Sequence, residues 1–278
     1  MLRQRILTAL AIVVPVFLLI GFGPTWLFAL FVLLAVGLGA WEWARLGGLS
    51  GGAPRAAFVG AIVLLAGALL LLRAHGGWSA LHVLVLALAV LWWFAVFLGL
   101  VWYRPGFASG SWGRFLLRAA GFLTLVPAGL ALVWLHDADP RLVIYLILLV
   151  AAADTGAFFT GRLFGRTKLA PAISPGKTRE GVLGALGAVF VVAAVASRVF
   201  GLPPMDALLF ALLSILVALV SVAGDLQESV LKREAGAKDS GALLPGHGGV
   251  LDRVDSLTAA APVFLAGLLW APLLNVGA

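Results

Sequence analysis

Apolar runs long enough to cross a membrane as helices recur along almost the whole chain. A helix needs about 20 mostly apolar residues to cross the hydrocarbon core of a bilayer, whereas the strands of a membrane β-barrel would appear as short segments of alternating polarity. The runs therefore predict an all-α integral membrane protein with about nine transmembrane helices. We expect these spans at residues 5–22, 25–42, 57–73, 79–101, 115–135, 141–161, 181–199, 206–224 and 255–274.

The composition supports this class and excludes several kinds of chemistry. Of the 278 residues, 63% are hydrophobic and 11% are charged, whereas soluble domains are about half apolar and about a quarter charged. The chain has no Cys, which excludes disulfides, thiolate metal ligands and a cysteine nucleophile. No separate soluble domain is evident, so we expect residues 1–278 to form a single polytopic membrane domain.

The basic residues predict how the chain is oriented. If the N-terminus is cytoplasmic, only Arg73, Arg141 and Arg198 of the nineteen Lys and Arg residues fall outside. Positive charges concentrate on the cytoplasmic side of membrane proteins, so we expect a cytoplasmic N-terminus and an external C-terminus. The net charge of +7 then reflects topology rather than nucleic-acid binding. Arg3 and Arg5 could also begin a signal peptide, but no small-residue cleavage site follows, and we expect an uncleaved first span.

The two halves of the chain differ in their polar content. The first five spans carry few polar residues, so residues 1–135 are expected to act as scaffold, and residues 136–278 to carry the site in their spans and cytoplasmic loops. Glu42, between two Trp residues, is the exception in the first half. We expect it to be a solvated charge at the membrane interface; a role in the site is the alternative.

Residues 224–256 form the longest polar passage and hold six of the twelve acids. Polar groups at the edge of a membrane must be satisfied by each other, by water or by a ligand. If the eighth helix continues past Gly224, Asp225, Glu228, Ser229 and Lys232 share one of its faces. Such a face is either an ordinary solvated stripe or a surface that presents a carboxylate to a metal and an ammonium to a phosphate.

The end of this passage adds two more acids and a glycine-rich turn. Asp252 and Asp255 are three residues apart and share a face at the start of the ninth span; helix capping explains one of them but not both. His247 lies among glycines and is either a structural hydrogen bonder or a ligand. The four His residues show no paired metal spacing, so zinc is not expected. Oxygen ligands alone suit a hard cation such as Mg²⁺.

The sixth span contains an acid inside the membrane. Asp154 lies roughly 12 Å from the span end at Arg162, at about 1.5 Å per residue. A carboxylate at that depth costs several kcal/mol unless it has a partner. It is therefore a candidate for function, with a metal or a loop base as its partner. The alternative is a protonated carboxyl that is hydrogen-bonded to a neighbouring helix.

The loop at residues 161–181 combines hydroxyls and bases at the start of a helix. Ser174 and Lys177 belong to a Ser-Pro-Gly-Lys-Thr string that Arg179 directly follows. The string is not a Walker A loop, because Pro171 stands where that motif needs Gly. Donors at a helix N-terminus suit an anion, and we favour phosphate binding. The alternative is that these bases only follow the positive-inside rule.

The polar passage resembles the signature of the phosphatidate cytidylyltransferases, the CDP-diacylglycerol synthases. Every position that the signature specifies is filled over 27 residues: Ser229, Leu231, Lys232, Arg233, Lys238, Asp239, Gly241, Leu244, Pro245, His247, Gly248, Gly249, Val250, Asp252, Arg253, Val254 and Asp255. Asp154-Thr155, the Ser-Pro-Gly-Lys-Thr loop and Gly224-Asp225 are also similar to that family, so the likeness covers most of the chain.

The resemblance implies an activity, a cofactor and a location. CTP and phosphatidic acid would give CDP-diacylglycerol and pyrophosphate in phospholipid biosynthesis, with Mg²⁺ and a monovalent cation such as K⁺. A homodimer in the bacterial inner membrane, with its site facing the cytoplasm, is expected, and no nucleic acid. Asp225 and Asp252 are assigned to Mg²⁺, with Asp255 and Asp154 as further candidates, and Asp225, Lys232 and Asp252 to catalysis. The substrates would contact Ser174, Lys177, Arg179, Ser229, Arg233, Lys238, His247 and Arg253.

Two other classes were weighed against this reading. A secondary transporter would place charges near the midplane on broken helices within a repeat of two halves, whereas these charges gather at one face and in the C-terminal half. A CDP-alcohol phosphotransferase would carry an Asp-Gly-x2-Ala-Arg motif with spaced aspartates, and the sequence has none.

Overall fold

A computed structural model describes residues 13–243, 248–271, 273, 274 and 276 of the chain. Three groups of predicted residues lie outside these ranges and are not considered further in structural terms. They are the basic pair Arg3 and Arg5, the Leu244-Pro245 pair of the signature, and His247.

Within the described residues, seven helices are long and apolar enough to cross a membrane, which confirms the predicted class. They are α2 (Thr25–Leu46), α3 (Gly52–Gly76), α4 (Ala80–Val101), α5 (Ser111–Ala138), α6 (Pro140–Phe164), α7 (Arg179–Val199) and α8 (Pro204–Glu234). Each overlaps one of the expected spans: α4 starts one residue later than expected, and the others extend their spans by a few residues, or by ten at the end of the eighth.

The first and ninth expected spans differ from this group. The described part of the first is a short apolar helix, Val13–Phe22. The ninth corresponds to α9 (Leu251–Trp270), which starts four residues before the expected span and is not among the seven candidates. Its first two turns carry Asp252, Arg253 and Asp255, and its middle, Thr258–Leu265, is continuously buried by other helices. Helix α9 is therefore an internal element of the bundle.

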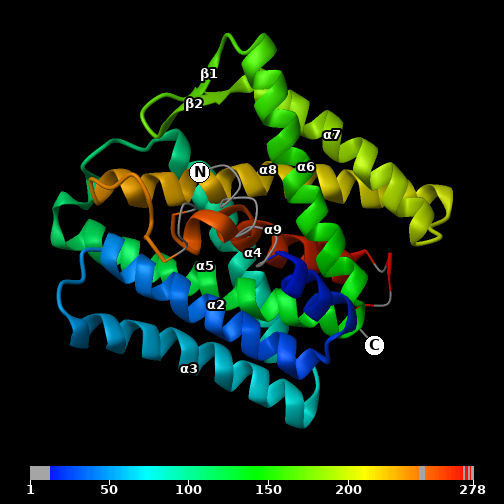
Figure 1. Cartoon of the computed structure of the whole chain (residues 1–278), viewed down its shortest axis with the longest axis horizontal. Coiled ribbons are helices and arrows are strands. Elements are labelled where there is room, and N and C mark those ends of the chain that lie inside the picture. Colours follow the sequence, from blue (N-terminus) through cyan, green and yellow to red (C-terminus); the bar gives the residue numbers. More distant parts are fainter. Residues whose placement is uncertain (1–12, 244–247, 272, 275, 277–278) are drawn as a thin grey trace.

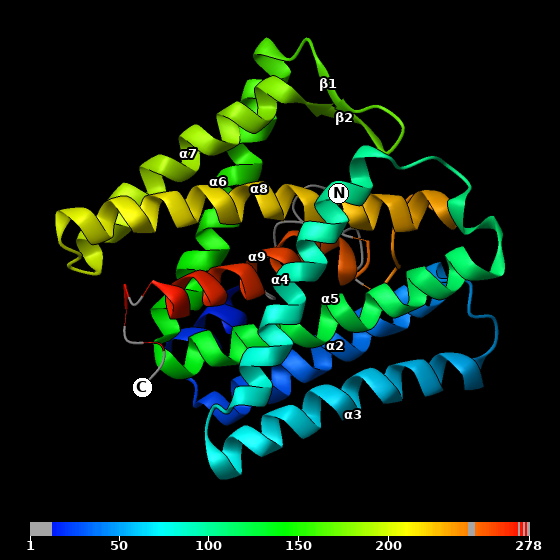
Figure 2. The same cartoon turned by 180° about the vertical axis from the view of Figure 1, so that it is seen from behind.

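The helices are stacked around α9, as Figures 1 and 2 show. In Figure 1, α7 lies in the upper part of the molecule, α6 runs from the top down past α8 to the lower right, and α9 lies in the centre. Below α9 come α2 with α5, and then α3 at the outer edge. Figure 2 shows α4 crossing the opposite side over α5, α9 and α8. Helix α9 thus packs against α4, α5, α6 and α8.

The outer helices expose the apolar side chains that a bilayer requires. Leu64 of α3, Leu91 of α4 and Leu183 of α7 are 74%, 63% and 69% exposed. Apolar surface of this extent would be unfavourable in water, whereas lipid tails solvate it as well as a protein interior does. The exposed leucines therefore mark the lipid-facing surface of a multi-pass membrane protein.

The predicted loop at residues 161–181 contains a small antiparallel hairpin, which the all-α expectation did not include. Strand β1 (Lys168–Ala170) pairs with β2 (Ser174–Thr178), and the hairpin lies at the meeting point of α6 and α7 (Figure 1). Between the strands, Ile173 packs with Leu226 and Val230 of α8. The Nε of Arg233 donates a hydrogen bond to the carbonyl of Ile173 at 3.1 Å. The hairpin is thereby fixed over the C-terminal part of α8.

Candidate active site

Helix α8 continues ten residues past Gly224, so the predicted polar face forms. Asp225, Glu228, Ser229 and Lys232 lie on successive turns of one face. Their side chains enter two neighbouring polar clusters. We call the one beneath the hairpin the hairpin cluster (Asp154, Lys177, Asp225 and Asp255), and the one beside the α8–α9 connection the loop cluster (Glu228, Lys232, Ser240 and Asp252).

The hairpin cluster brings together charges from α6, β2, α8 and α9. The Nζ of Lys177 lies 2.6 Å from Oδ2 of Asp225, and the hydroxyl of Ser229 donates to Oδ1 of the same carboxylate at 3.4 Å. The charges of Asp154 and Asp255 interact with both Asp225 and Lys177. Four elements that are distant in the sequence thus place three carboxylates around one ammonium group.

Glycines let the helices that carry these acids approach closely. A Cβ atom on Gly224 would lie 2.7 Å from the carbonyl oxygen of Asp255 and 2.9 Å from Cβ of Ala259, so only glycine fits where α8 crosses α9. A Cβ on Gly156 would lie 2.5 Å from the carbonyl oxygen of Gly184. The absence of a side chain at Gly156 therefore lets α6 pack closely against α7. Small residues are the usual means of close helix packing in membranes. The first crossing brings Asp225 next to Asp255.

The hairpin cluster has more negative than positive charge. Asp154 is exposed and forms no hydrogen bond or ion pair within the described part of the chain, so the hydrogen-bonded alternative has no counterpart there. Asp255 accepts a hydrogen bond from the backbone N–H of Ser256 at 2.7 Å. Carboxylate oxygens in excess suit a hard divalent cation. Nevertheless, no three acidic, His or Cys side chains of residues 13–243 and 248–271 are arranged to hold a metal as they stand.

The loop cluster is a buried network of ion pairs. The Nζ of Lys232 lies 2.6 Å from Oε2 of Glu228 and 2.8 Å from Oδ1 of Asp252. These carboxylate side chains are only 3% and 8% exposed. Oδ2 of Asp252 accepts hydrogen bonds from Ser240 N, Ser240 Oγ and Gly249 N at 2.9, 2.9 and 2.8 Å. A buried pair that loses one partner costs about 3–5 kcal/mol, so this network fixes the position of Asp252.

The two predicted primary metal ligands therefore lie in different surroundings. Asp225 lies with the further candidates Asp154 and Asp255 in the hairpin cluster. Asp252 lies in the loop cluster, where Oδ1 pairs with Lys232 and Oδ2 accepts three hydrogen bonds. The assignment of Asp252 to Mg²⁺ stays a prediction. Spacing alone indicated that Asp252 and Asp255 share a helix face, but not that each would join a different cluster.

The expectation for Glu42 was wrong. Its side chain is 2% exposed rather than solvated, and its carboxylate accepts hydrogen bonds from the backbone N–H groups of Val250 and Leu251 at 3.0 and 2.8 Å. The first N–H groups of a helix have no partner within the helix, and Glu42 supplies acceptors for two of them at the start of α9. A role of Glu42 in the site was the alternative that the sequence left open, whereas Ser240 was not singled out from the sequence.

The predicted substrate-binding residues surround the two clusters to different extents. Ser174 is half-buried in β2, and Arg179 is exposed at the first position of α7. Between them, Thr178 Oγ1 accepts from Gly181 N at 3.1 Å and caps α7, which gives this hydroxyl a structural role. Lys238 is exposed in the α8–α9 connection. Arg253 is also exposed and has an interaction partner of its own.

Glu234 at the end of α8 fixes the α4–α5 connection. Its carboxylate accepts hydrogen bonds from the Tyr103 hydroxyl and from the N–H groups of Gly106 and Ala108, at 2.7, 2.8 and 2.9 Å. Burial, together with the hydrogen bond to Glu234, raises the pKa of Tyr103 above its usual range, so this hydroxyl stays a donor at neutral pH.

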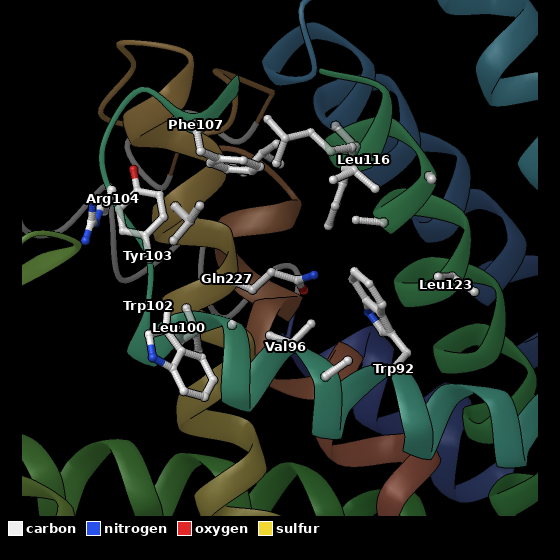
Figure 3. A pocket seen from close by; sticks show the side chains of 18 residues that line it. Trp92, Val96, Leu100, Trp102, Tyr103, Arg104, Phe107, Leu116, Leu123 and Gln227 are labelled. Carbon is white, nitrogen blue, oxygen red and sulfur yellow. The ribbon is translucent and has the colours of Figure 1, made fainter. Parts of the chain in front are cut away.

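An apolar cavity of about 580 Å³ lies on the other side of α8 from both clusters. Figure 3 shows Gln227 of α8 and Trp92 of α4 facing each other across it, with Phe107 and Leu116 along one side. Gln227, Val230 and Leu231 are the α8 residues that line it. None of the predicted site residues does, so this cavity is not the predicted active site.

The fold and the clusters define a multi-pass membrane protein with a charged site at the hairpin and the α8–α9 connection. A model described as "Cytidylyltransferase family" matches residues 3–270. A phosphatidate cytidylyltransferase of Pseudomonas aeruginosa is 45% identical, over 98% of each chain. That of Haemophilus influenzae is 38% identical over 95% of this chain and 97% of the relative. The chain belongs to the phosphatidate cytidylyltransferase family, which confirms the resemblance.

Proposed function

We propose that the protein transfers the cytidylyl group of CTP to phosphatidic acid, giving CDP-diacylglycerol and pyrophosphate. The observation that carries this proposal is the 45% identity to a phosphatidate cytidylyltransferase over 98% of both chains. The site geometry is consistent with it, because acids and bases converge from α6, β2, α8 and α9 in a chain that is otherwise almost entirely apolar.

The reaction needs no nucleophilic side chain. An oxygen of the phosphatidate phosphate attacks the α-phosphorus of CTP, a new P–O bond forms, and the bond to the β-phosphate breaks to release pyrophosphate. The protein then contributes positioning and charge neutralisation. Lys177 and Lys232 stand beside carboxylates within the clusters, and Arg179, Arg233 and Lys238 lie on the flanking segments, where they would contact the phosphates together with Ser174 and Ser229.

The hairpin cluster has the donor chemistry that suits the Mg²⁺ implied by the family resemblance, although its carboxylates are not arranged to hold an ion as they stand. Its donors are oxygens only, they come from three helices, and Asp154 has no hydrogen-bond partner among the described residues. Asp225 would hold the ion with Asp154 and Asp255, and Asp252 would offer Oδ1, which it now shares with Lys232. When bound, the ion would neutralise phosphate charge. A monovalent cation and a homodimer remain expectations of the resemblance.

The proposed activity can be tested with the purified full-length protein in detergent. CTP, phosphatidic acid and Mg²⁺ are supplied, and the lipid extract is analysed by mass spectrometry. CDP-diacylglycerol that forms only when all three are present is the expected result. A folded protein that forms none under these conditions would contradict the proposal and would direct attention to transport assays.

Lys177→Ala is expected to raise the apparent KM for CTP or for phosphatidic acid by about tenfold or more. Interactions with charged groups contribute about 1.5–3 kcal/mol, and about 1.4 kcal/mol corresponds to a factor of ten. Steady-state kinetics with each substrate varied in turn measure this effect. Lys168→Ala is the matched control, because Lys168 is an exposed lysine of the same hairpin. If both variants have wild-type KM values, the hairpin lysine has only a topological role.

We also propose that the hairpin and both clusters face the cytoplasm, where CTP is available. The chain has no Cys, so single cysteines report their own accessibility. Ala172→Cys in the hairpin and Met205→Cys at the start of α8 are both at exposed positions. In oriented membrane vesicles, an impermeant maleimide is expected to label residue 172 from the cytoplasmic side and residue 205 from the other. Labelling of both from one side would overturn this orientation.

A further inference from the structure

We propose that Glu42 is a positioning residue that holds Asp252 in place through Ser240 and the first turn of α9. The proposal rests on the proposed transfer activity and deepens it, since it assigns a residue of the N-terminal half to the same site. Four groups of contacts support it: those of the Glu42 carboxylate, those of the glycines around it, those of Ser240 and those of Arg45.

The Glu42 carboxylate makes three hydrogen bonds with the segments that flank Asp252. Oε1 accepts from Val250 N at 3.0 Å, and Oε2 accepts from Leu251 N at 2.8 Å and from the Ser240 hydroxyl at 3.0 Å. A carboxylate at a helix N-terminus is also stabilised by the helix dipole. Glu42 thus fixes the two residues that directly precede Asp252 in the chain.

Two glycines form a compartment that fits this carboxylate. A Cβ atom on Gly249 would lie 2.5 Å from both carboxylate oxygens of Glu42, and one on Gly241 would lie 2.7 Å from its Cδ. A larger residue at either position would therefore displace the Glu42 carboxylate. Since the backbone of the α8–α9 connection encloses the carboxylate on two sides, the conformation of this connection depends on Glu42.

Ser240 links Glu42 to Asp252 directly. It is fully buried, and its hydroxyl lies 3.0 Å from Oε2 of Glu42 and 2.9 Å from Oδ2 of Asp252. A hydroxyl has one hydrogen to donate, so it is shared between the two carboxylates. The same Oγ accepts from Asp252 N at 3.3 Å. A change at Glu42 therefore alters the hydrogen bonding of Asp252 and, through Asp252, the position of Lys232.

Arg45, one turn further along α2, holds the same connection. Its Nη2 donates to the carbonyl oxygen of Ser240 at 2.5 Å and to that of Asp239 at 3.2 Å. The C-terminal part of α2 therefore fixes both the side chain and the backbone of Ser240. This arrangement places α2, which the sequence indicated as scaffold, in direct contact with the proposed site.

The test compares Glu42→Gln, Ser240→Ala and the double variant in the full-length protein. Gln keeps the shape of Glu but directs an amide NH₂ toward N–H donors. We expect each single variant to lower kcat by about 10- to 100-fold, as is typical when a residue that orients a functional group is lost, with KM for CTP changed less than kcat. We expect the double variant to be no slower than the slower single variant, because both act through one pathway.

Asp137→Asn is the matched control for the loss of a carboxylate. It removes an ion pair with Arg73 in which no residue of either cluster takes part, and is expected to leave kcat unchanged. Thermal unfolding of all four variants shows whether the folded state is kept. Ser240→Ala, which removes only one hydroxyl, serves where Glu42→Gln does not fold.

The outcomes separate this inference from the proposed function. No transfer by the wild-type protein would refute the proposed function itself. An active wild type with a Ser240→Ala variant of unchanged kcat would overturn the positioning role, as would independent, multiplicative effects in the double variant. A kcat that falls only in proportion to lost folded protein, equally in Asp137→Asn, would also overturn it.

Discussion

Asp225→Asn is expected to abolish transfer, with kcat reduced by at least about a hundredfold, while the protein stays folded. Loss of a residue that only supports a metal ligand already costs about 10- to 100-fold, so loss of a proposed ligand costs more. The Asp225 side chain is 30% exposed and forms an ion pair with Lys177. Because a partly exposed ion pair contributes little to the free energy of unfolding, we expect its loss to leave the protein folded. Transfer kinetics and thermal unfolding together measure both parts of this prediction.

The matched control for Asp225→Asn is Asp239→Asn. Asp239 is an acid of the signature, but its side chain is exposed in the α8–α9 connection. We expect this variant to retain most of its activity. An Asp225→Asn variant with wild-type kcat at saturating Mg²⁺ would remove the hairpin cluster from the reaction.

Asp252→Asn is expected to abolish transfer as well, but also to destabilise the protein. Its carboxylate is 8% exposed and pairs with Lys232, so the substitution leaves a buried ammonium with Glu228 as its remaining ion-pair partner. Breaking a buried pair costs about 3–5 kcal/mol. The structure thus distinguishes Asp252 from Asp225, although both are assigned to Mg²⁺ from the sequence.

Thermal unfolding measured in parallel for Asp252→Asn and Asp225→Asn tests this difference. The Tm of Asp252→Asn should fall clearly below that of Asp225→Asn in the same detergent. Equal Tm values would show that the loop cluster does not hold the connection in the way that its hydrogen bonds suggest.

The membrane helices could be predicted from the sequence because a bilayer constrains local composition. Every span must be apolar over its whole length, and seven of the nine expected runs are helices of that kind. The polar face of α8 could also be predicted, since residues three and four apart share a helix face whatever surrounds them. Both predictions depend on neighbours in the sequence.

The partners of the polar residues could not be predicted in this way. Glu42 contacts Val250 and Leu251, which are about two hundred residues away, and an acid between two Trp residues at a helix end is equally compatible with a solvated position. Asp252 and Asp255 differ in their partners because Gly224 lets α8 approach α9 at Asp255, while Ser240 reaches Asp252. Only the tertiary packing distinguishes these cases.

The hairpin was missed for a different reason. Its strands are three and five residues long, and Pro175 and Gly176 in β2 are usually signs of a turn or loop. The hairpin is stabilised by packing of Ile173 on α8 rather than by a pattern within its own sequence. The same packing brings Lys177 to Asp225.

The measurement that tests the central claim most directly follows the two ends of the triphosphate. CTP labelled at the α-phosphate and CTP labelled at the γ-phosphate are each incubated with the protein, phosphatidic acid and Mg²⁺. We predict that the α-label enters the lipid phase, that the γ-label stays in water as pyrophosphate, and that Asp225→Asn transfers neither. Label from the γ-phosphate in the lipid, or unchanged transfer of the α-label by Asp225→Asn, would contradict this account of the site.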